Sequence, residues 1–369
     1  MECKHFGKCG SCNFYDNSYG DALEIKAKEV SELLKEFYSD ELEIFKSIEA
    51  GHRARAEFKI WHVGDSCHYA MTNIDKNGIE LISECPKVIE AISKVQYPLL
   101  DEINSSEILK KKLFSIEFLG TKSGELLVTM IYHRKLEQEW KEEAKELEKQ
   151  FNICIIGRSR KQKVVLSNEY VTERLNVGGE EFSYRYYEGG FTQPNPFVNE
   201  KMISWVINRV QNSDGDLLEA YCGLGNFTIP LSRHFNRVLA TEISKNSIKA
   251  AKENCALNGV DNIEFIRLNA EETAQAIAKS REFRRLKDVD LDIYNFSTIL
   301  VDPPRAGLDE ASRNLAKSFD NIVYISCNPK TLARDLKELC NTHKVVRGAV
   351  FDQFPYTNHI ESGVYLEQI

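Results

Sequence analysis

The stretch Leu217–Phe227, "LLEAYCGLGNF", joins an apolar run to a turn that contains Gly223 and Gly225. The run predicts a buried strand. Glycine at a strand-to-helix turn lets the backbone approach a ligand closely because no Cβ intervenes. A lone G-x-G is weak evidence, since a plain tight turn explains it equally well. The flanking sequence decides between these two interpretations.

From about residue 185 onward, short apolar runs alternate with helical stretches such as "SKNSIKAAKENCALNG". The strand candidates are "DLLEAYCG", "RVLATE", "NIEFIRLNA", "STILVDPP", "NIVYISC" and "VVRGAVFDQF". This alternation predicts an α/β fold in which parallel strands are joined by helical crossovers, a doubly wound sheet. Ligands of such sheets bind at the carboxyl ends of the strands.

The residues at those strand ends favour a nucleoside without phosphates. Glu242 follows Gly223 by 19 positions, roughly where this topology places an acidic residue on a ribose diol. The residues after Gly225 are Asn-Phe-Thr, so the full G-x-G-x-x-G of a pyrophosphate loop is absent. S-adenosylmethionine (SAM) therefore fits better, although Glu242 as a plain helix cap stays open. Asp302 stands before two prolines that end its strand and hold it at the same edge, or merely terminate the strand.

The region from about 50 to 175 has a different, α+β pattern. "RARAEFKIWH" alternates apolar and largely basic residues, as a half-buried strand does. "ELLVTMIYH" predicts a second strand, "LEQEWKEEAKELEKQF" an amphipathic helix, and "NICIIGRSRKQKVVL" one further strand. Together with a helix in "DALEIKAKEVSELLKEF", these patterns divide the chain into 1–50, 51–180 and 181–369.

Composition bounds the class of protein. The chain has 369 residues, 42% of them apolar and 28% charged, which is typical of a globular protein with room for two cores. We see no apolar run of about 18 residues and no signal-peptide h-region, so we expect a cytoplasmic protein without a membrane span. The net charge of −8 argues mildly against nucleic acid for the whole chain, but a local basic face can still bind it.

Cysteine is frequent, with ten residues, and for this compartment we expect reduced thiols, metal ligands or catalysts. "CKHFGKCGSC" spaces Cys3, Cys9 and Cys12 as C-x5-C-x2-C. Three thiols this close indicate a metal or iron–sulfur site that lacks a fourth ligand.

Five motifs together carry a family resemblance. "GGFTQPNPFVNEKM", "YCGLGNF", "VDPPRAGLD", "YISCNP" and "FDQFPYTNHIES" resemble, in this order, the RNA (uracil-5-)-methyltransferases, with wording nearest to the TrmA type that acts on tRNA. "RAEFKIWH" and "LFSIEFLGTKSGELLVTMIYHRKL" are similar to the same type. The resemblance covers about residues 50–369. It implies a Rossmann-like, SAM-dependent methyltransferase sheet at the C-terminus after an α+β RNA-binding region.

The resemblance also implies roles for single residues. The SAM contacts of the family fall on Gln193, Tyr221, Asn226, Glu242 and Asp302. Its nucleophile falls on Cys327 and its general base on Glu361, while Phe114 and Lys59 fall where the type touches its RNA.

This chemistry needs such groups. C5 of uracil is a poor nucleophile until a thiolate adds to C6, and a base must then remove the C5 proton before the thiolate leaves. Cys327 precedes a predicted helix, "CNPKTLARDLKEL", whose N-terminus we expect to favour the thiolate. We predict that the remaining cysteines outside the N-terminal group are structural thiols: Cys67, Cys154, Cys222, Cys255 and Cys340.

RNA binding requires a flipped base and neutralised phosphates. An aromatic surface at Phe114 would replace the lost stacking, with a core position as the alternative. The candidate phosphate contacts, each with a solvated face as its alternative, are Arg53, Arg55, Lys59, Arg158, Arg160, Lys161 and Lys163.

Four cysteines leave open whether the RNA substrate is tRNA or ribosomal RNA. Ribosomal-RNA members of the superfamily complete a similar N-terminal trio with a Cys-Pro that binds a [4Fe–4S] cluster, and Cys85-Pro86 stands at the matching place here. A cluster, a zinc ion or free thiols remain the alternatives for Cys3, Cys9, Cys12 and Cys85. Our first interpretation is a monomeric methyltransferase that forms 5-methyluridine at position 54 in the T loop of tRNA, with tmRNA as a further substrate. The alternatives are a 23S rRNA uracil-C5 methyltransferase with a cluster, and an RNA-binding or folding module with incidental methylation.

Overall fold

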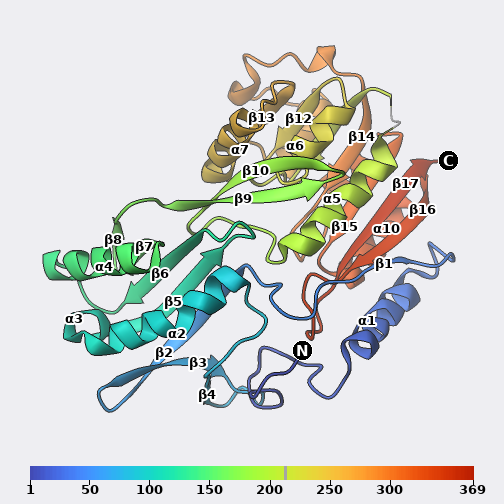
Figure 1. The fold of residues 1–369 in the computed structure, drawn as a ribbon. Coiled ribbons are helices and arrows are strands. Elements are labelled where there is room, and N and C mark those ends of the chain that lie inside the picture. Colours follow the sequence, from blue (N-terminus) through green and yellow to red (C-terminus); the bar gives the residue numbers. More distant parts are fainter. Residues whose placement is uncertain (212–213) are drawn as a thin grey trace.

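The computed structural model describes residues 1–211 and 214–369. In these residues the strands form three sheets: a large sheet mainly of the C-terminal half, a second large sheet of the N-terminal half, and a hairpin between them (Figure 1). None of the described helices has the length and apolar character needed to cross a membrane.

The C-terminal sheet confirms the predicted doubly wound arrangement. Its strands, in spatial order, are β1 (Glu43–Phe45), β16 (His343–Phe351), β17 (Glu361–Gln368), β15 (Asn321–Ser326), β14 (Phe296–Val301), β11 (Asp216–Ala220), β12 (Val238–Thr241) and β13 (Ile263–Ile266). β17 is antiparallel to both its neighbours, whereas the other pairs are parallel. The reversed strand follows from the loop 352–360, which turns the chain back from β16 and inserts β17 between β16 and β15.

Helices separate most of these strands. Those of the C-terminal half are α5 (Pro196–Val210), α6 (Thr228–Leu231), α7 (Lys245–Leu257), α8 (Ala270–Ile277), α9 (Glu310–Ala316) and α10 (Pro329–Leu339). Short 3₁₀ turns lie at Ser232–His234, Arg284–Leu286 and Leu291–Ile293.

The first 50 residues are built into this C-terminal unit. Helix α1 (Tyr19–Leu34) buries Leu23, Ala27 and Val30 in the same apolar core that contains side chains of α10. Strand β1 extends the sheet by pairing with β16. Two demands explain the arrangement: the apolar face of α1 needs a cover, and β16 would otherwise be an exposed edge. The segment 1–50, predicted as a separate unit, thus shares a core and a sheet with residues far along the chain.

The N-terminal sheet confirms the α+β pattern. Its strands, in spatial order, are β4 (Ile79–Leu81), β3 (Ser66–Thr72), β2 (Arg55–Val63), β5 (Leu113–Gly120), β6 (Leu126–Tyr132), β7 (Cys154–Ser159) and β8 (Gln162–Val165). The helices of this half are α2 (Glu90–Ser105), α3 (Glu107–Lys110) and α4 (Gln138–Phe151). The single strand predicted for "NICIIGRSRKQKVVL" is wrong, because the chain reverses between β7 and β8 at Arg160-Lys161, where Lys161 adopts a φ of 59°.

The hairpin of β9 (Tyr170–Val177) and β10 (Glu180–Tyr187) joins the two halves. Its side chains pack in the core of the C-terminal half, beside the turn after β11. The boundary predicted at 180/181 falls at the start of β10, inside this hairpin.

Candidate active site

Five candidate residues meet at one edge of the C-terminal sheet. Tyr221, Glu242, Asp302 and Cys327 each directly follow a parallel strand, namely β11, β12, β14 and β15. Glu361 reaches the same edge because it is the first residue of the reversed strand β17. Parallel strands place their carboxyl ends together, so residues far apart in the sequence become neighbours there.

Strand register brings the predicted nucleophile beside the predicted base. Ser326 of β15 pairs with Ser362 of β17, so Cys327 and Glu361 are the next residues outward on adjacent strands. Glu361 is only 5% exposed and Cys327 is half-buried. A carboxyl group and a thiol therefore share a site from which most water is excluded.

Burial shifts the titration of all three reactive groups at this edge. It raises the pKa of Glu361 to about 8, with a further increase from the nearby charge of Asp302 and an opposing effect of Arg305. Burial alone raises the pKa of Asp302 to about 7. Burial, then Glu361, then Asp302 raise the pKa of Cys327 to about 11.

The expected preference for the Cys327 thiolate is therefore wrong for the protein without ligands. The predicted helix is present, since α10 begins at Pro329 and Asn328 caps it. Its N-terminus favours negative charge, but desolvation and two neighbouring carboxyl groups oppose that charge more strongly.

The glycine turn after β11 offers space for a ligand. Gly223 and Gly225 have φ values of 56° and 90°, and Tyr221 has a φ of 65°, a conformation uncommon for a residue with a side chain. A Cβ on Gly223 would meet no heavy atom within 4 Å, so this glycine faces open space. Its absence of a side chain keeps the backbone open to a nucleoside, which fits SAM.

Glu242 is oriented toward this turn. One of its carboxylate oxygens accepts a hydrogen bond from the Gly223 amide at 3.2 Å, and the other accepts one from the Ser244 amide at 2.7 Å. Each oxygen keeps a further lone pair, so the carboxylate can still accept from a ribose diol.

Two of the predicted SAM contacts, Asn226 and Gln193, hydrogen-bond through their side-chain amides to other side-chain amides. Asn226 exchanges hydrogen bonds of 2.8 and 2.9 Å with Asn199 of α5. The Gln193 side-chain oxygen accepts from Gln353 Nε2 at 3.2 Å. Both side chains thus have fixed orientations. Tyr221 is similarly held, its hydroxyl lying 3.3 Å from Ser312 Oγ.

The structure adds two residues that our sequence reasoning missed. Gln353, 1% exposed, links the loop 352–360 to Gln193. Glu219 is buried in β11, where desolvation raises its pKa to about 8. A carboxylate inside the apolar run "LLEA" was a visible anomaly, and Gln353 lies inside the motif "FDQFPYTNHIES", although its pairing with Gln193 cannot be inferred from that motif.

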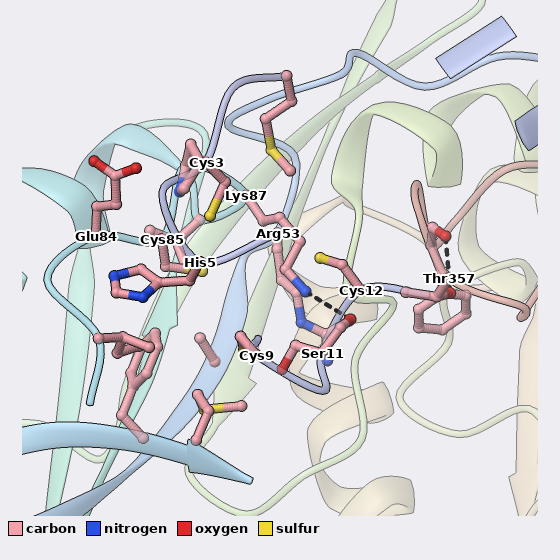
Figure 2. A pocket seen from close by; sticks show the side chains of 18 of the residues that line it. Cys3, His5, Cys9, Ser11, Cys12, Arg53, Glu84, Cys85, Lys87 and Thr357 are labelled. Atoms are coloured by element: carbon pink, nitrogen blue, oxygen red, sulfur yellow. Dashed lines mark hydrogen bonds between the residues drawn. The ribbon is translucent and has the colours of Figure 1, made fainter. Parts of the chain in front are cut away.

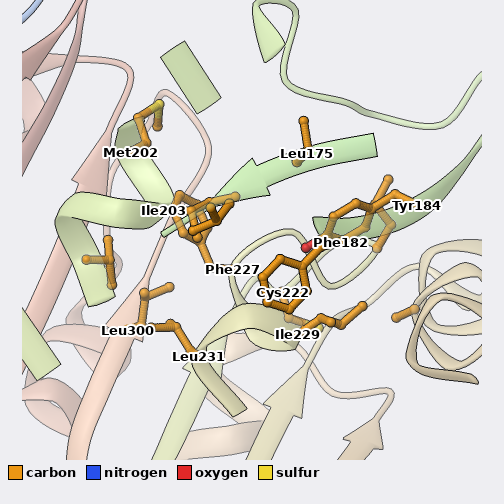
Figure 3. Packing of buried hydrophobic residues seen from close by; sticks show 14 of the residues in the cluster. Leu175, Phe182, Tyr184, Met202, Ile203, Cys222, Phe227, Ile229, Leu231 and Leu300 are labelled. Carbon is orange, nitrogen blue, oxygen red and sulfur yellow. The ribbon is translucent and has the colours of Figure 1, made fainter. Parts of the chain in front are cut away.

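Of the predicted structural thiols, Cys67, Cys222 and Cys255 are buried, whereas Cys154 and Cys340 are half-buried. Figure 3 shows Cys222 in the apolar packing formed by Phe182, Phe227 and their neighbours from β10 and the turn after β11. Its side chain therefore supports the glycine turn from the core side.

The four N-terminal candidate ligands line one cavity of about 380 Å³. Figure 2 shows Cys3, Cys9, Cys12 and Cys85 around Lys87, whose ammonium donates to the Ser11 carbonyl at 3.1 Å. Desolvation raises the pKa of Cys3, Cys12 and Cys85. No three histidine, cysteine or carboxylate side chains within 1–211 and 214–369 are close enough to hold a single metal ion.

Phe114 is exposed, so the core alternative for it is wrong. A register shift between Leu113 and Ser115 makes Phe114 the extra residue of a bulge in β5. Phe114 is 42% exposed, and its ring stacks on that of His133, with ring centroids 4.3 Å apart. Lys59 of the neighbouring strand β2 is exposed as well.

Some of the basic residues predicted to contact RNA phosphates already interact with other groups of the chain, and others are exposed. Arg158 donates to both oxygens of Glu188 at 2.8 and 2.5 Å, and Lys163 pairs with Glu169 at 2.6 Å. Arg53 lies over the Phe354 ring and Arg55 donates to the Gly190 carbonyl. The exposed members are Lys59, Arg160, Lys161 and Lys163, of which Lys163 is engaged by its ion pair.

Comparison with known proteins identifies the family of this chain. The family model described as tRNA (Uracil-5-)-methyltransferase matches residues 18–369. Proteins named tRNA/tmRNA (uracil-C(5))-methyltransferase from a Sulfurovum species and from Aliarcobacter butzleri are 59% and 50% identical, each over 100% of both chains. The crystal structure of Pyrococcus abyssi tRNA (uracil-54, C5)-methyltransferase in complex with S-adenosyl-L-homocysteine (SAH) shares the fold, with a TM-score of 0.75 and 23% identity over 96% of this chain and 85% of that one. The chain therefore belongs to the tRNA (uracil-5-)-methyltransferase family.

Proposed function

We propose that this protein methylates C5 of a uridine in the T loop of tRNA, at position 54, through a covalent bond between Cys327 and C6 of the base. Its family makes it a SAM-dependent tRNA uracil-C5 methyltransferase. The observation that carries the proposed residue roles is the register of β15 and β17, which sets Cys327 beside Glu361 at the sheet edge.

Cys327 acts as the nucleophile. Its sulfur adds to C6 of the flipped uracil, and the negative charge that results is delocalised to C5 and the O4 oxygen. The high pKa of the free thiol means that its proton has to be removed as the bond forms. The Asp302 carboxylate, whose charge also acts on the thiol, is our proposed acceptor for that proton, which leaves Glu361 ionised for its later step.

Glu361 acts later as the base. After C5 has gained its methyl group, the adduct still carries the C5 proton, and the Glu361 carboxylate removes it so that the C6–S bond can break. A pKa of about 8 suits a base near neutral pH better than the ordinary value of 4.5.

Gln193, Tyr221, Asn226, Glu242 and Asp302 would hold SAM at the glycine turn. When bound, SAM supplies a methyl group from its sulfonium, and the sulfur that loses the methyl group becomes a neutral thioether. The chain's part is to orient this donor: Glu242 would accept hydrogen bonds from the ribose, and the open backbone at Gly223 would leave room for it.

The direct test incubates the purified protein with methyl-labelled SAM and separated tRNA, tmRNA and ribosomal RNA, and maps the labelled nucleotide. We expect label at C5 of one T-loop uridine of tRNA, and of tmRNA if its matching loop is accepted. Label found only in 23S rRNA would overturn the proposed substrate, and RNA refolding without any label would favour the RNA-folding alternative.

We also propose that Phe114 and the exposed cations Lys59, Arg160 and Lys161 contact the RNA. Bulging at Phe114 presents its ring and that of His133 as one stacking surface. Arg160 and Lys161 line a surface hollow of about 1000 Å³ next to His133. An aromatic platform beside basic groups is the usual means of binding unpaired nucleotides.

Phe114→Ala is expected to raise the Kd for tRNA by about 5- to 150-fold, because stacking contributes roughly 1–3 kcal/mol per base. SAH binding, measured by calorimetry on the same preparation, should stay unchanged and serves as the control for folding. Unchanged tRNA affinity would remove Phe114 from the interface.

Finally, we propose that Cys3, Cys9, Cys12 and Cys85 hold a [4Fe–4S] cluster. Four thiols on one cavity fit such a group. A single tetrahedral zinc would need its sulfurs only about 4 Å apart, given Zn–S bonds of about 2.3 Å, and no such group occurs among the described residues. Lys87 and Arg53 line the same cavity and would offset the charge of four thiolates.

Protein purified without oxygen should contain about four iron atoms per chain and absorb visible light as iron–sulfur proteins do. Cys85→Ser is expected to remove most of this iron, whereas Cys154→Ser, a half-buried cysteine outside the cavity, should retain it. Wild-type protein with stoichiometric zinc, or with neither metal, would contradict the proposal.

A further inference from the structure

The loop 352–360, which connects β16 to Glu361, is unusually buried for a loop. Asp352, Gln353 and Tyr356 are at most 2% exposed. A buried loop must satisfy its polar groups internally, because water cannot reach them. The partners that do so come largely from the first 50 residues of the chain.

Lys26 is central among these partners. It lies on α1, and its side chain is 3% exposed. Its ammonium donates to the Asp352 carboxylate and to the carbonyls of Phe354 and His359, the last two at 3.2 Å each. An ammonium has three donors, so all three are used within this one loop.

These acceptors lie on both arms of the loop. Asp352 and Phe354 belong to the arm that leaves β16, whereas His359 stands two residues before Glu361. Lys26 therefore links the two arms, which also meet where Phe351 pairs with Glu361 and where the rings of Phe354 and His359 lie 5.7 Å apart. Gln353, on the first arm, donates to the Gln193 side-chain oxygen. By holding both arms, Lys26 therefore connects the position of Gln193 with that of Glu361.

Other N-terminal groups hold the tip of the loop. The amides of Asn13 and Phe14 donate to the Tyr356 carbonyl at 2.8 and 3.2 Å, and the N-terminal ammonium donates to its hydroxyl at 2.7 Å. Tyr356 itself has a φ of 61°, which requires such external support. Among these contacts only Lys26 bridges the two arms.

We propose that Lys26 is a positioning residue for catalysis: it holds the loop 352–360 so that Glu361 is aligned with C5 of the methylated base. This inference rests on the proposed role of Glu361. A misplaced Glu361 would slow proton removal from C5, so the covalent intermediate would persist, while the earlier addition of Cys327 and the binding of SAM would change little.

The test compares Lys26→Met with Lys28→Met, which alters an exposed lysine on the same helix. Because Lys26→Met leaves Asp352 buried without its partner, the double variant Lys26→Met/Asp352→Asn is made as well. Each variant is checked for SAH binding, then mixed with tRNA and SAM. Turnover and the amount of protein–RNA adduct that survives denaturation are measured.

For the Lys26 variants that bind SAH we expect kcat to fall at least tenfold with KM for tRNA within about twofold, and adduct to accumulate. Lys28→Met should behave as wild type. A purely structural role would lower all steps together and leave no extra adduct, and that result would overturn the inference, as would wild-type turnover. Failure of the proposed function is a different outcome, in which Glu361→Gln itself traps no adduct.

Discussion

Cys327→Ser is expected to lower the rate of uridine methylation by about 10⁴-fold or more, a loss typical of removing a covalent nucleophile. A serine hydroxyl is far less acidic and less nucleophilic than a thiol. At this buried edge, beside Glu361 and Asp302, an alkoxide would be still harder to form. Without addition to C6, C5 stays unactivated and the methyl group has no acceptor.

The measurement is a single-turnover assay with labelled SAM and tRNA, supported by gel analysis for covalent adduct. The variant should bind SAH and tRNA normally yet form no adduct. Cys340→Ser is the matched control, because this half-buried cysteine caps the other end of α10 and lies outside the site. Substantial methylation by Cys327→Ser would rule out the covalent route.

Glu361→Gln is expected to stop turnover after methyl transfer. Glutamine keeps the size of the side chain but cannot accept the C5 proton, so the Cys327–C6 bond cannot break. The protein should accumulate as a methylated adduct with RNA that survives denaturation, at close to one per active site. Product release at the normal rate would remove Glu361 from its proposed role.

The same substitution should also stabilise the fold, increasingly as pH rises. Glu361 has a pKa of about 8 in the folded protein and about 4.5 when unfolded, so between these values only the folded state holds the proton. Wild-type stability therefore falls as pH rises through this range, whereas glutamine does not titrate. We expect the Tm of Glu361→Gln to exceed that of wild type by several degrees at pH 8.5 and by little at pH 5.

Glu367→Gln, at the exposed end of the same strand β17, is the control for both effects. It should form no lasting adduct and should show no pH-dependent gain in Tm. A Tm of Glu361→Gln below that of wild type at every pH would mean that the buried carboxylate is stabilised by contacts stronger than its desolvation.

Local patterns predicted much of this molecule. Alternating apolar runs and helices predicted strands β11 to β16 of the C-terminal sheet, because burial on both faces leaves a strong sequence pattern. They did not predict the short strand β1 or the antiparallel direction of β17. Sequence motifs made Cys327, Asp302 and Glu242 candidates, and each directly follows its strand in the structure. The exposure of Phe114 was not predictable, since it depends on a bulge in the pairing of β5 with β6.

Long-range polar contacts were the main omission. Lys26 shares the apolar face of α1 with Leu23 and Val30, so a charged residue on that face was a sign of a buried partner. The identity of that partner could not be inferred, because Asp352 lies 326 positions away. The titration of Cys327 was likewise misjudged, since the adjacent helix is visible in the sequence but the surrounding carboxyl groups are not.

By itself, the sequence determined the family and the fold class of both halves and supplied candidates for the reactive groups, because strand and helix periodicity and short motifs are local properties. The tertiary structure alone decided how those groups meet. The antiparallel pairing of β17 with β15 places Glu361 next to Cys327, and burial raises the pKa of both groups. Lys26 of the first helix holds the loop 352–360 that leads to Glu361. Register, desolvation and contacts across hundreds of residues arise only when the chain is folded.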